Sequence, residues 1–350
     1  MGSKIYKIIF GVKPIKITYI TSDYFPQKNA GVARARSYVE EMVGRGYDVE
    51  VITCLGAKSI TGERLFTTLL GNPQGTKGLT IRLLREVFFV IEVVARLLMT
   101  NKERTVIVSS PPFMGSIIPV IFGSKFRSVI LDVRDLYPDV FFHSGVLKQT
   151  SCIGRIFCFI EKKAYDCSSA VVTVCGSLLT SIESRTCNKK LVLVANGYPK
   201  AFSARGGAVS FSPGERVRVL CSGNFGRFQD IDFLIDLSTV CSLKIPLIDF
   251  YFVGFGSKFL NLKAMTSSNC TFLDTLSQEH LLEVIQGAHI GISARTDDFI
   301  GNNALPVKVL EYLALDLPVI SLPAIDDLKV FEPQSNLFQF GYKDGVNQVV

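Results

Sequence analysis

The chain has 350 residues, 48% of them hydrophobic and 20% charged, which predicts a globular protein of two domains. Its nine Cys include no C-x-x-C pair, which excludes a disulfide framework and a zinc site and favours a reducing cytoplasm. The net charge of +7 divides into +12 over residues 1–200 and −5 over residues 201–350. This division predicts that the first half of the chain binds an anionic surface or a lipid diphosphate. Nucleic acid is disfavoured as a partner, because the sequence has no Arg-rich or aromatic-interleaved patch.

The first half of the chain alternates short β-branched runs with segments of helical periodicity, the pattern of a parallel α/β sheet. The strands are predicted at Ile15–Thr21, Val49–Thr53, Thr105–Ser109, Ser128–Val133, Ala170–Val174 and Leu191–Val194. The helices are predicted at Val32–Val43, Ile81–Met99, Ile153–Tyr165 and Ser177–Ser184. The polar, glycine-rich stretch Gly56–Thr80 is predicted to be a surface excursion.

The segment Ile81–Met99 is the most apolar stretch of the chain. A simple membrane span is disfavoured, because the segment is interrupted by Arg82, Arg85, Glu86, Glu92 and Arg96. We therefore predict an amphipathic helix that packs on the first domain's sheet, and partial contact with a membrane interface stays open. No signal peptide is recognisable in the sequence.

Polar and glycine residues follow the predicted strands of the first half at their carboxyl ends, where ligands bind in open α/β sheets. Gly31 ends the loop after the first strand, Ser110 lies in S-S-P-P, and Arg134 with Asp135 lies in R-D-L-Y-P. His143 follows a few residues later. Each of these has a plainer alternative as a turn or surface residue.

A segment of small and polar residues at 201–212 places the domain boundary near residue 200, so the predicted domains are 1–199 and 200–350. The second domain repeats the α/β pattern. Its strands are predicted at Val217–Cys221, Asp249–Val253, Asn269–Phe272, Ile290–Ser293 and Val319–Leu322, and its helices at Ile231–Val240, Gln278–Gln286 and from Pro306 onward. Residues 222–229, SGNFGRFQ, are predicted to be a glycine loop.

The segment 301–320, GNNALPVKVLEYLALDLPVI, carries the clearest chemical pattern. Pro306 suits the first turn of a helix, and Lys308 and Glu311 share one helix face. A helix N-terminus with a Lys suits a phosphate, and a Glu beside it could accept two neighbouring hydroxyls. Arg227 in the glycine loop could clamp a second phosphate. The alternatives are an ordinary amphipathic helix and a solvated Arg.

Three of these segments resemble family-4 glycosyltransferases, which have the two-domain GT-B fold. The P-x-K-x-x-E-Y run with the later P-V-I is similar to the family's nucleotide-sugar motif, S-G-N-F-G is similar to its S-G-N-x-G loop, and D-V-R-D-L-Y-P is similar to the D-x-R-D-L-W-P segment of members that build bacterial surface polysaccharides. The resemblance covers roughly residues 15–335. Asn303 departs from it where many members have Glu, and Ala30-Gly31 departs from a Gly-Gly pair.

The resemblance implies retaining transfer of a sugar from a nucleotide diphosphate, with UDP preferred, to an acceptor on a polyprenyl diphosphate in lipopolysaccharide or other surface-polysaccharide synthesis. It implies two Rossmann-like domains that face a central cleft, no cofactor and a peripheral place on the inner face of the cell membrane. The catalytic candidates are Glu311, Lys308, Arg227 and Asp135; the donor-binding candidates are Gly223, Asn224, Gly226, Asn303, Pro306 and Val307; the acceptor-side candidates are Gly31, Ser110, Arg134 and His143. No metal is expected, because Asp230 and Asp232, which match D-x-D, suit a helix start better.

Two other functions remain open. A non-catalytic GT-B subunit that binds a partner transferase is favoured by Asn303 and by an expected lack of the family's final crossover helix before Val350. A nicotinamide-dependent oxidoreductase is disfavoured, because Phe259 occupies the third position of the would-be G-x-G-x-x-G fingerprint at Gly254. The sequence does not name the donor sugar, the base or the acceptor.

Overall fold

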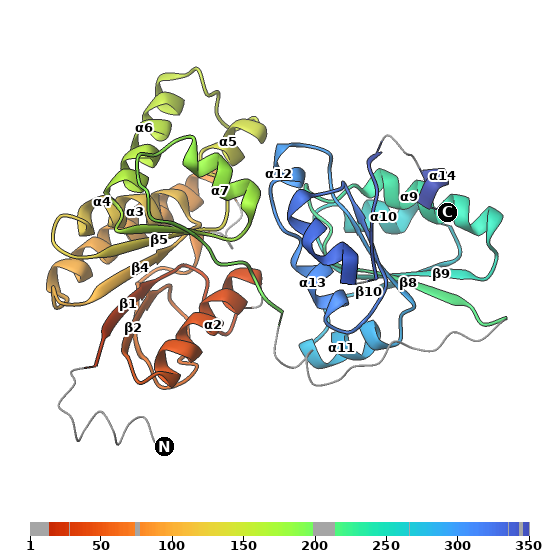
Figure 1. Cartoon of the computed structure of the whole chain (residues 1–350), viewed down its shortest axis with the longest axis horizontal. Helices are drawn as coiled ribbons and strands as arrows, with labels where there is room; N and C mark the ends of the chain where they lie inside the picture. Colours follow the sequence, from red (N-terminus) through yellow and green to blue (C-terminus); the bar gives the residue numbers. More distant parts are fainter. Residues whose placement is uncertain are drawn as a thin grey trace. The chain divides into compact units, whose positions relative to one another are not determined.

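The computed structural model describes residues 14–27, 29–73, 78–198, 214–265, 267–334, 336–342 and 346–349. The chain forms two compact units, Met1–Ala195 and Asn196–Val350, each built as a parallel sheet with helices on both faces (Figure 1). The predicted boundary at residue 200 and the small-residue segment at 201–212 lie outside the described residues.

Unit 1 contains a seven-stranded sheet with the order β3-β2-β1-β4-β5-β6-β7, in which every pair of neighbours is parallel. Its strands are β1 (Lys16–Ile20), β2 (Asp48–Thr53), β3 (Arg64–Thr67), β4 (Thr105–Ser109), β5 (Val129–Val133), β6 (Ala170–Thr173) and β7 (Leu191–Leu193). The chain runs outward from β1 in one direction and from β4 in the other, so the carboxyl ends of these two strands mark the switch point where such sheets bind ligands.

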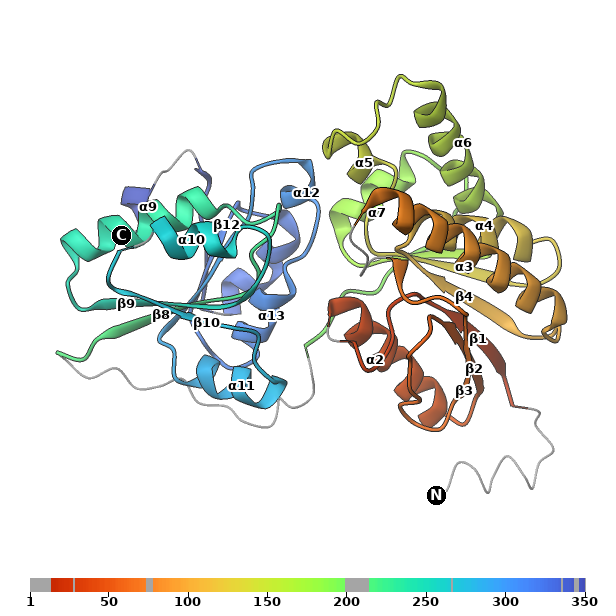
Figure 2. The ribbon, with the colours of Figure 1, turned by 180° about the vertical axis from the view of Figure 1, so that it is seen from behind.

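The helices of unit 1 are α2 (Ala30–Gly44), α3 (Leu79–Met99), α4 (Phe113–Gly123), α5 (Asp139–His143), α6 (Cys152–Cys167) and α7 (Gly176–Glu183). Figures 1 and 2 show α3, α4 and α6 side by side over one face of the sheet and α2 on the other. Val49 and Val51 of β2 pack in the core with α2, whereas the alternate residue Glu50 pairs with Arg96 of α3. This alternation of β2 fixes which helix covers which face.

Unit 2 contains a six-stranded parallel sheet with the order β10-β9-β8-β11-β12-β13. Its strands are β8 (Val217–Asn224), β9 (Ile248–Phe255), β10 (Cys270–Leu273), β11 (Ile290–Ala294), β12 (Val319–Leu322) and β13 (Leu337–Gln339). Its helices are α9 (Ile231–Lys244), α10 (Phe259–Met265), α11 (Gln278–Gln286), α12 (Phe299–Asn302), α13 (Val307–Leu313), the 3₁₀ helix η2 (Asp326–Gln334) and α14 (Val346–Val349). One hydrophobic cluster joins α9 and α10 to the sheet, and a second joins α11 and α13 to it.

The predicted pair of parallel α/β sheets is confirmed, with local corrections. The stretch Gly56–Thr80 is not only an excursion, because β3 lies within it. Gly223 and Asn224 are strand rather than loop residues, because β8 continues beside β9 to the end of both strands. Pro306 is the N-cap of α13, with extended backbone angles, rather than a residue of its first turn.

Candidate functional site

The side chain of Lys308 lies over the carboxyl end of β8. Gly223 there has φ +119°, and a Cβ on it would lie 3.5 Å from Lys308 Cε and 3.6 Å from Nζ. The ammonium donates a hydrogen bond to Gln229 Oε1 at 3.2 Å and lies 6.0 Å from the centre of the Phe225 ring. Both partners are neutral, and among the described residues no carboxylate forms an ion pair with Lys308. Burial lowers the pKa of this group, so its charge is poorly solvated and suited to an incoming anion.

Glu311 lies one turn further along α13 and is half-buried. Burial raises the pKa of its carboxyl to about 7, although the charge of Lys308 opposes this rise. An acceptor that exchanges its proton near neutral pH therefore lies beside a cation. A perturbed pair of this kind marks a candidate ligand site.

The short helix α13 is fixed to the sheet by Tyr312. The hydroxyl of Tyr312 accepts the backbone N–H of Ser222 at 2.9 Å and lies 2.7 Å from Ser222 Oγ. Its ring occupies the space above Gly291, where a Cβ would come within 2.4 Å of ring carbon Cδ2. These contacts hold the two charged residues of the same helix at the end of β8. Because α13 has only seven residues, we expect the charge of Lys308 to exceed the effect of the helix N-terminus.

The ends of β8 and β9 approach so closely that glycine is required. Gly254 has φ +145°, and a Cβ on it would lie 1.9 Å from the carbonyl oxygen of Gly223. After the strand, Gly226 lies beside the side chain of Asn224, with a would-be Cβ 3.2 Å from Oδ1. The backbone of this loop is thus open to close approach, as a phosphate requires. Arg227, on the same loop, is exposed, and its role as a clamp stays a prediction.

The remaining donor-side candidates lie before α13. Asn303 uses its side-chain amide within its own loop, because Nδ2 donates to the carbonyl of Phe299 at 2.7 Å. Pro306 is buried and Val307, the first residue of α13, is half-buried. These residues shape the turn into the helix. Asp230 caps α9 through the N–H of Phe233 at 3.0 Å, as the sequence predicted.

A second polar cluster lies in unit 1, at the switch point between β1 and β4. Arg134 Nη2 donates to Asp23 Oδ2 at 3.0 Å, and the Arg134 backbone N–H donates to Ser110 Oγ at 3.1 Å. Gly31, in the first turn of α2, lies against this pair: a Cβ on it would be 2.0 Å from Arg134 Nη1 and 2.4 Å from Asp23 Oδ2. Asn72 Nδ2 donates to Asp23 Oδ1 at 2.9 Å. The structure thus joins three predicted acceptor-side residues.

Asp135 and His143 lie differently. Asp135 is half-buried and, with Ser110 and Tyr137, lines a cavity of about 10 Å³, room for one water molecule. Burial, and then the charge of Asp135, raise the pKa of Tyr137 to about 12. His143 is exposed at the end of α5 and is not among the residues that line this cavity.

A buried ion pair in unit 1 was not predicted from the sequence. Arg34 Nη2 lies 2.6 Å from Asp132 Oδ1, and Nε lies 2.9 Å from Oδ2. Ser109 Oγ also donates to Asp132 at 3.0 Å, and Arg34 Nη1 donates to the carbonyl of Val194 at 2.8 Å. Asp132 opens the D-V-R-D run, so the motif contained the signal, but nothing local identified Arg34 as its partner.

Among the described residues no three metal-ligating side chains form a cluster, and no helix is long and apolar enough to cross a membrane. No protein-family model matches the sequence, and no curated protein matches it.

Known structures do resemble this one. Sucrose-phosphate synthase from Thermosynechococcus elongatus superposes with a TM-score of 0.72 at 14% identity, over 96% of this chain and 88% of that one. The lipopolysaccharide glycosyltransferase WaaG gives 0.67 at 14% identity, over 95% and 89%. HepE of Anabaena, in complex with UDP and glucose, gives 0.64 at 12% identity, over 95% and 89%. The chain therefore has the two-domain GT-B fold of these glycosyltransferases.

Proposed function

We propose that this protein is a retaining glycosyltransferase that moves a hexosyl or N-acetylhexosaminyl group from a UDP-linked donor to an acceptor on a polyprenyl diphosphate. The observation that carries the proposal is the Lys308 ammonium, half-buried over the open backbone of Gly223 with Glu311 one turn away. The GT-B fold supports it, as do the UDP complex of HepE and the role of WaaG in lipopolysaccharide synthesis. Such an acceptor would place the protein at the inner face of a cell membrane, in surface-polysaccharide synthesis.

The donor would bind to unit 2 through its diphosphate and its ribose. Negative charge develops on the leaving diphosphate as the bond to the sugar breaks, and a fixed cation stabilises this charge without a metal. Lys308 would supply it, with Arg227 as the clamp on the distal phosphate and the backbone of Gly223, Asn224 and Gly226 as the close surface. Glu311, once ionised, would accept both hydroxyls of the ribose.

The acceptor would bind to unit 1 at the switch point of its sheet. Ser110 and the Arg134–Asp23 pair provide hydrogen-bonding groups there. Gly31 has no side chain, and the Arg134–Asp23 pair occupies the space that a Cβ at this position would fill. A retaining transfer needs no strong protein base if the leaving diphosphate takes the acceptor's proton. If a side chain assists, Asp135, beside Ser110, is the better placed candidate, and His143 is the second.

The test is thermal melting with UDP, GDP and their sugar conjugates, because a ligand of the native state raises the midpoint. We expect a shift with a uridine nucleotide that is lost in Lys308→Met and kept in Lys263→Met, which removes an exposed Lys of α10. A charge-assisted hydrogen bond is worth about 1.5–3 kcal/mol, so Lys308→Met should weaken binding by roughly 10- to 100-fold.

The same samples separate catalysis from binding alone. Transfer of radiolabelled sugar to a polyprenyl-diphosphate saccharide would support the enzyme. Nucleotide binding without sugar transfer or donor hydrolysis would favour the non-catalytic subunit. Asn303 fits this role, because it stands where many members of the family have Glu and its side-chain amide bonds the carbonyl of Phe299 within the protein. No shift with any nucleotide would refute the donor site.

A further inference from the structure

Helix α3 has the reverse of the usual distribution of polarity on a surface helix. None of its five charged residues is exposed. Glu86 is buried and accepts the backbone N–H groups of Met114 and Gly115 at 2.5 and 3.3 Å, and Glu92 accepts that of Leu69 at 2.8 Å. Arg96 pairs with buried Glu50. Glu86, Glu92 and Arg96 therefore bind groups of unit 1, and no charged residue of α3 is exposed on its outer face.

The outer face of α3 is apolar along its length. Leu84, Phe88, Ile91 and Leu98 recur at helical spacing and are 59%, 49%, 57% and 62% exposed. A helix on the surface of a water-soluble domain normally places such residues against the core and polar residues outward. An exposed apolar stripe of this length marks an interaction surface rather than scattered surface residues.

One neighbouring helix, α6, adds further exposed apolar residues to this stripe, whereas no residue of α4 is exposed. Helix α4 packs against both α3 and α6 (Figure 2) and has no charged residue from Phe113 to Gly123. On α6, Ile153, Ile156 and Phe159 are 56–64% exposed. We call the exposed apolar residues of α3 and α6 the apolar face: Leu84, Phe88, Ile91, Leu98, Ile153, Ile156 and Phe159. It lies on two helices that both pack against α4.

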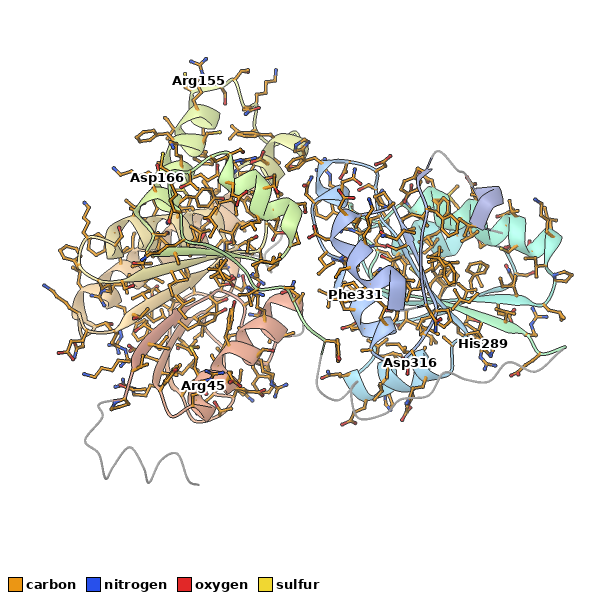
Figure 3. The ribbon with its side chains drawn as sticks, in the orientation of Figure 1. Arg45, Arg155, Asp166, His289, Asp316 and Phe331 are labelled. Carbon is orange, nitrogen blue, oxygen red and sulfur yellow. The ribbon has the colours of Figure 1, made fainter. Side chains whose placement is uncertain are left out.

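Exposed basic residues lie on these helices and just beyond their ends: Lys102 after α3, Lys125 after α4, and Lys148, Arg155 and Lys163 before or on α6. Figure 3 shows Arg155 pointing away from α6 at its outer end. Two carboxylates on the same segments, Glu103 and Asp166, are paired with Lys16 and Lys162. Apolar residues with surrounding cations are the pattern that binds an anionic lipid interface.

We propose that the apolar face is the membrane-binding surface of this protein and inserts into the headgroup region of an anionic bilayer. The charge favours lipid over a second copy of the chain, because two copies would bring the same basic residues of unit 1 together. This proposal rests on the proposed function, which places the acceptor at a membrane. Lipid binding by the apolar face requires neither a nucleotide-sugar donor nor sugar transfer, so the membrane surface and the glycosyltransferase activity can be refuted independently.

The test is cosedimentation of the full chain with vesicles of phosphatidylcholine alone or with 30% phosphatidylglycerol. We expect binding to the anionic vesicles that weakens with salt, and at least tenfold weaker binding for the triple variant Leu84→Ser, Phe88→Ser, Ile91→Ser. The control is Leu243→Ser with Leu260→Ser, which removes two apolar residues of unit 2 that are even more exposed, at 79% and 76%. All variants are first checked for an unchanged melting temperature.

Equal binding of the triple variant and the wild type would overturn the proposal, as would an equal loss in the control. Analytical ultracentrifugation without lipid tests whether the apolar face binds a second copy of the chain instead. A wild-type dimer that the triple variant converts to a monomer, together with no vesicle binding, would make the apolar face a protein interface instead.

Discussion

The contact of Gly31 with the Arg134–Asp23 pair can be tested with Gly31→Ala, because the packing and the helix propensity of Ala predict opposite changes in the free energy of unfolding. In an exposed helix, Gly→Ala stabilises by up to about 1 kcal/mol. In Gly31→Ala the new methyl would lie 2.0 Å from Arg134 Nη1 and 2.4 Å from Asp23 Oδ2, so one partner must move. We therefore expect this substitution to destabilise unit 1.

The magnitude follows from what the displaced pair loses. Arg134 and Asp23 have side chains only 11% and 8% exposed, so the hydrogen bond between them is worth about 1.5–3 kcal/mol. Crowding adds about 1 kcal/mol, and the helix propensity of Ala offsets about as much. The net loss is about 2 kcal/mol, which lowers the melting temperature by about 4–8 °C in a domain of this size.

The assay is differential scanning calorimetry of Gly31→Ala and of Gly44→Ala, at the other end of α2, where a Cβ meets nothing within 4 Å. Gly44→Ala should be neutral or stabilising. In the background Arg134→Met the cost of Gly31→Ala should shrink, because the nearer contact is gone. If Gly31→Ala melts at or above Gly44→Ala, the Arg134–Asp23 pair does not occupy this position, and the proposal that the acceptor binds there loses its support.

Three further outcomes are expected. Affinity for a UDP-linked sugar, measured by calorimetric titration from about pH 5.5 to 8.5, should rise as the pH passes about 7. The reason is that the pKa of Glu311 is raised to about 7 and that its carboxylate binds the ribose only when ionised. Glu311→Gln should bind the same ligand weakly, and its affinity should not rise over this pH range. Asp132→Asn should cost about 3–5 kcal/mol in urea unfolding, because it removes the only carboxylate that forms an ion pair with the buried Arg34 among the described residues, and a double variant Arg34→Met, Asp132→Leu should recover part of this. Tyr312→Phe should cost about 1–3 kcal/mol in the same assay, since it leaves the buried Ser222 N–H without its acceptor, and an unchanged midpoint would contradict the geometry.

The strands were predictable because a parallel sheet buries both faces of each strand, so its strands are short β-branched runs. The prediction of β8 ended too early at Cys221, because Gly223 is read as a loop residue from its type alone. Its extension depends on the partner β9, which supplies Gly254 at the matching position. Helix α4 was not predicted, because F-M-G-S-I-I-P-V-I-F-G is apolar on every side and contains Pro119.

The site was predictable to the extent that its chemistry is local. Lys308 and Glu311 are three residues apart on one helix, so their type and spacing suffice to propose a ligand site. Other contacts of the two sites join residues that are distant in sequence. Gln229 lies 79 residues from Lys308, and Asp23 lies 111 residues from Arg134. Such pairs depend on the folded topology and on no local pattern.

The position of α4 connects the apolar face to the polar cluster of Ser110, Arg134 and Asp23 within unit 1. Ser110, whose hydroxyl accepts the N–H of Arg134, is followed after two prolines by the first residue of α4. The N-terminus of α4 is in turn held by the buried carboxylate of Glu86 on α3, through Met114 and Gly115. Helix α3 and the polar cluster are therefore joined through α4 by hydrogen bonds rather than by a long loop. An α3 that lies in a bilayer would thus hold Ser110 and Arg134 at a constant depth, which suits an acceptor whose own diphosphate is fixed at the lipid surface.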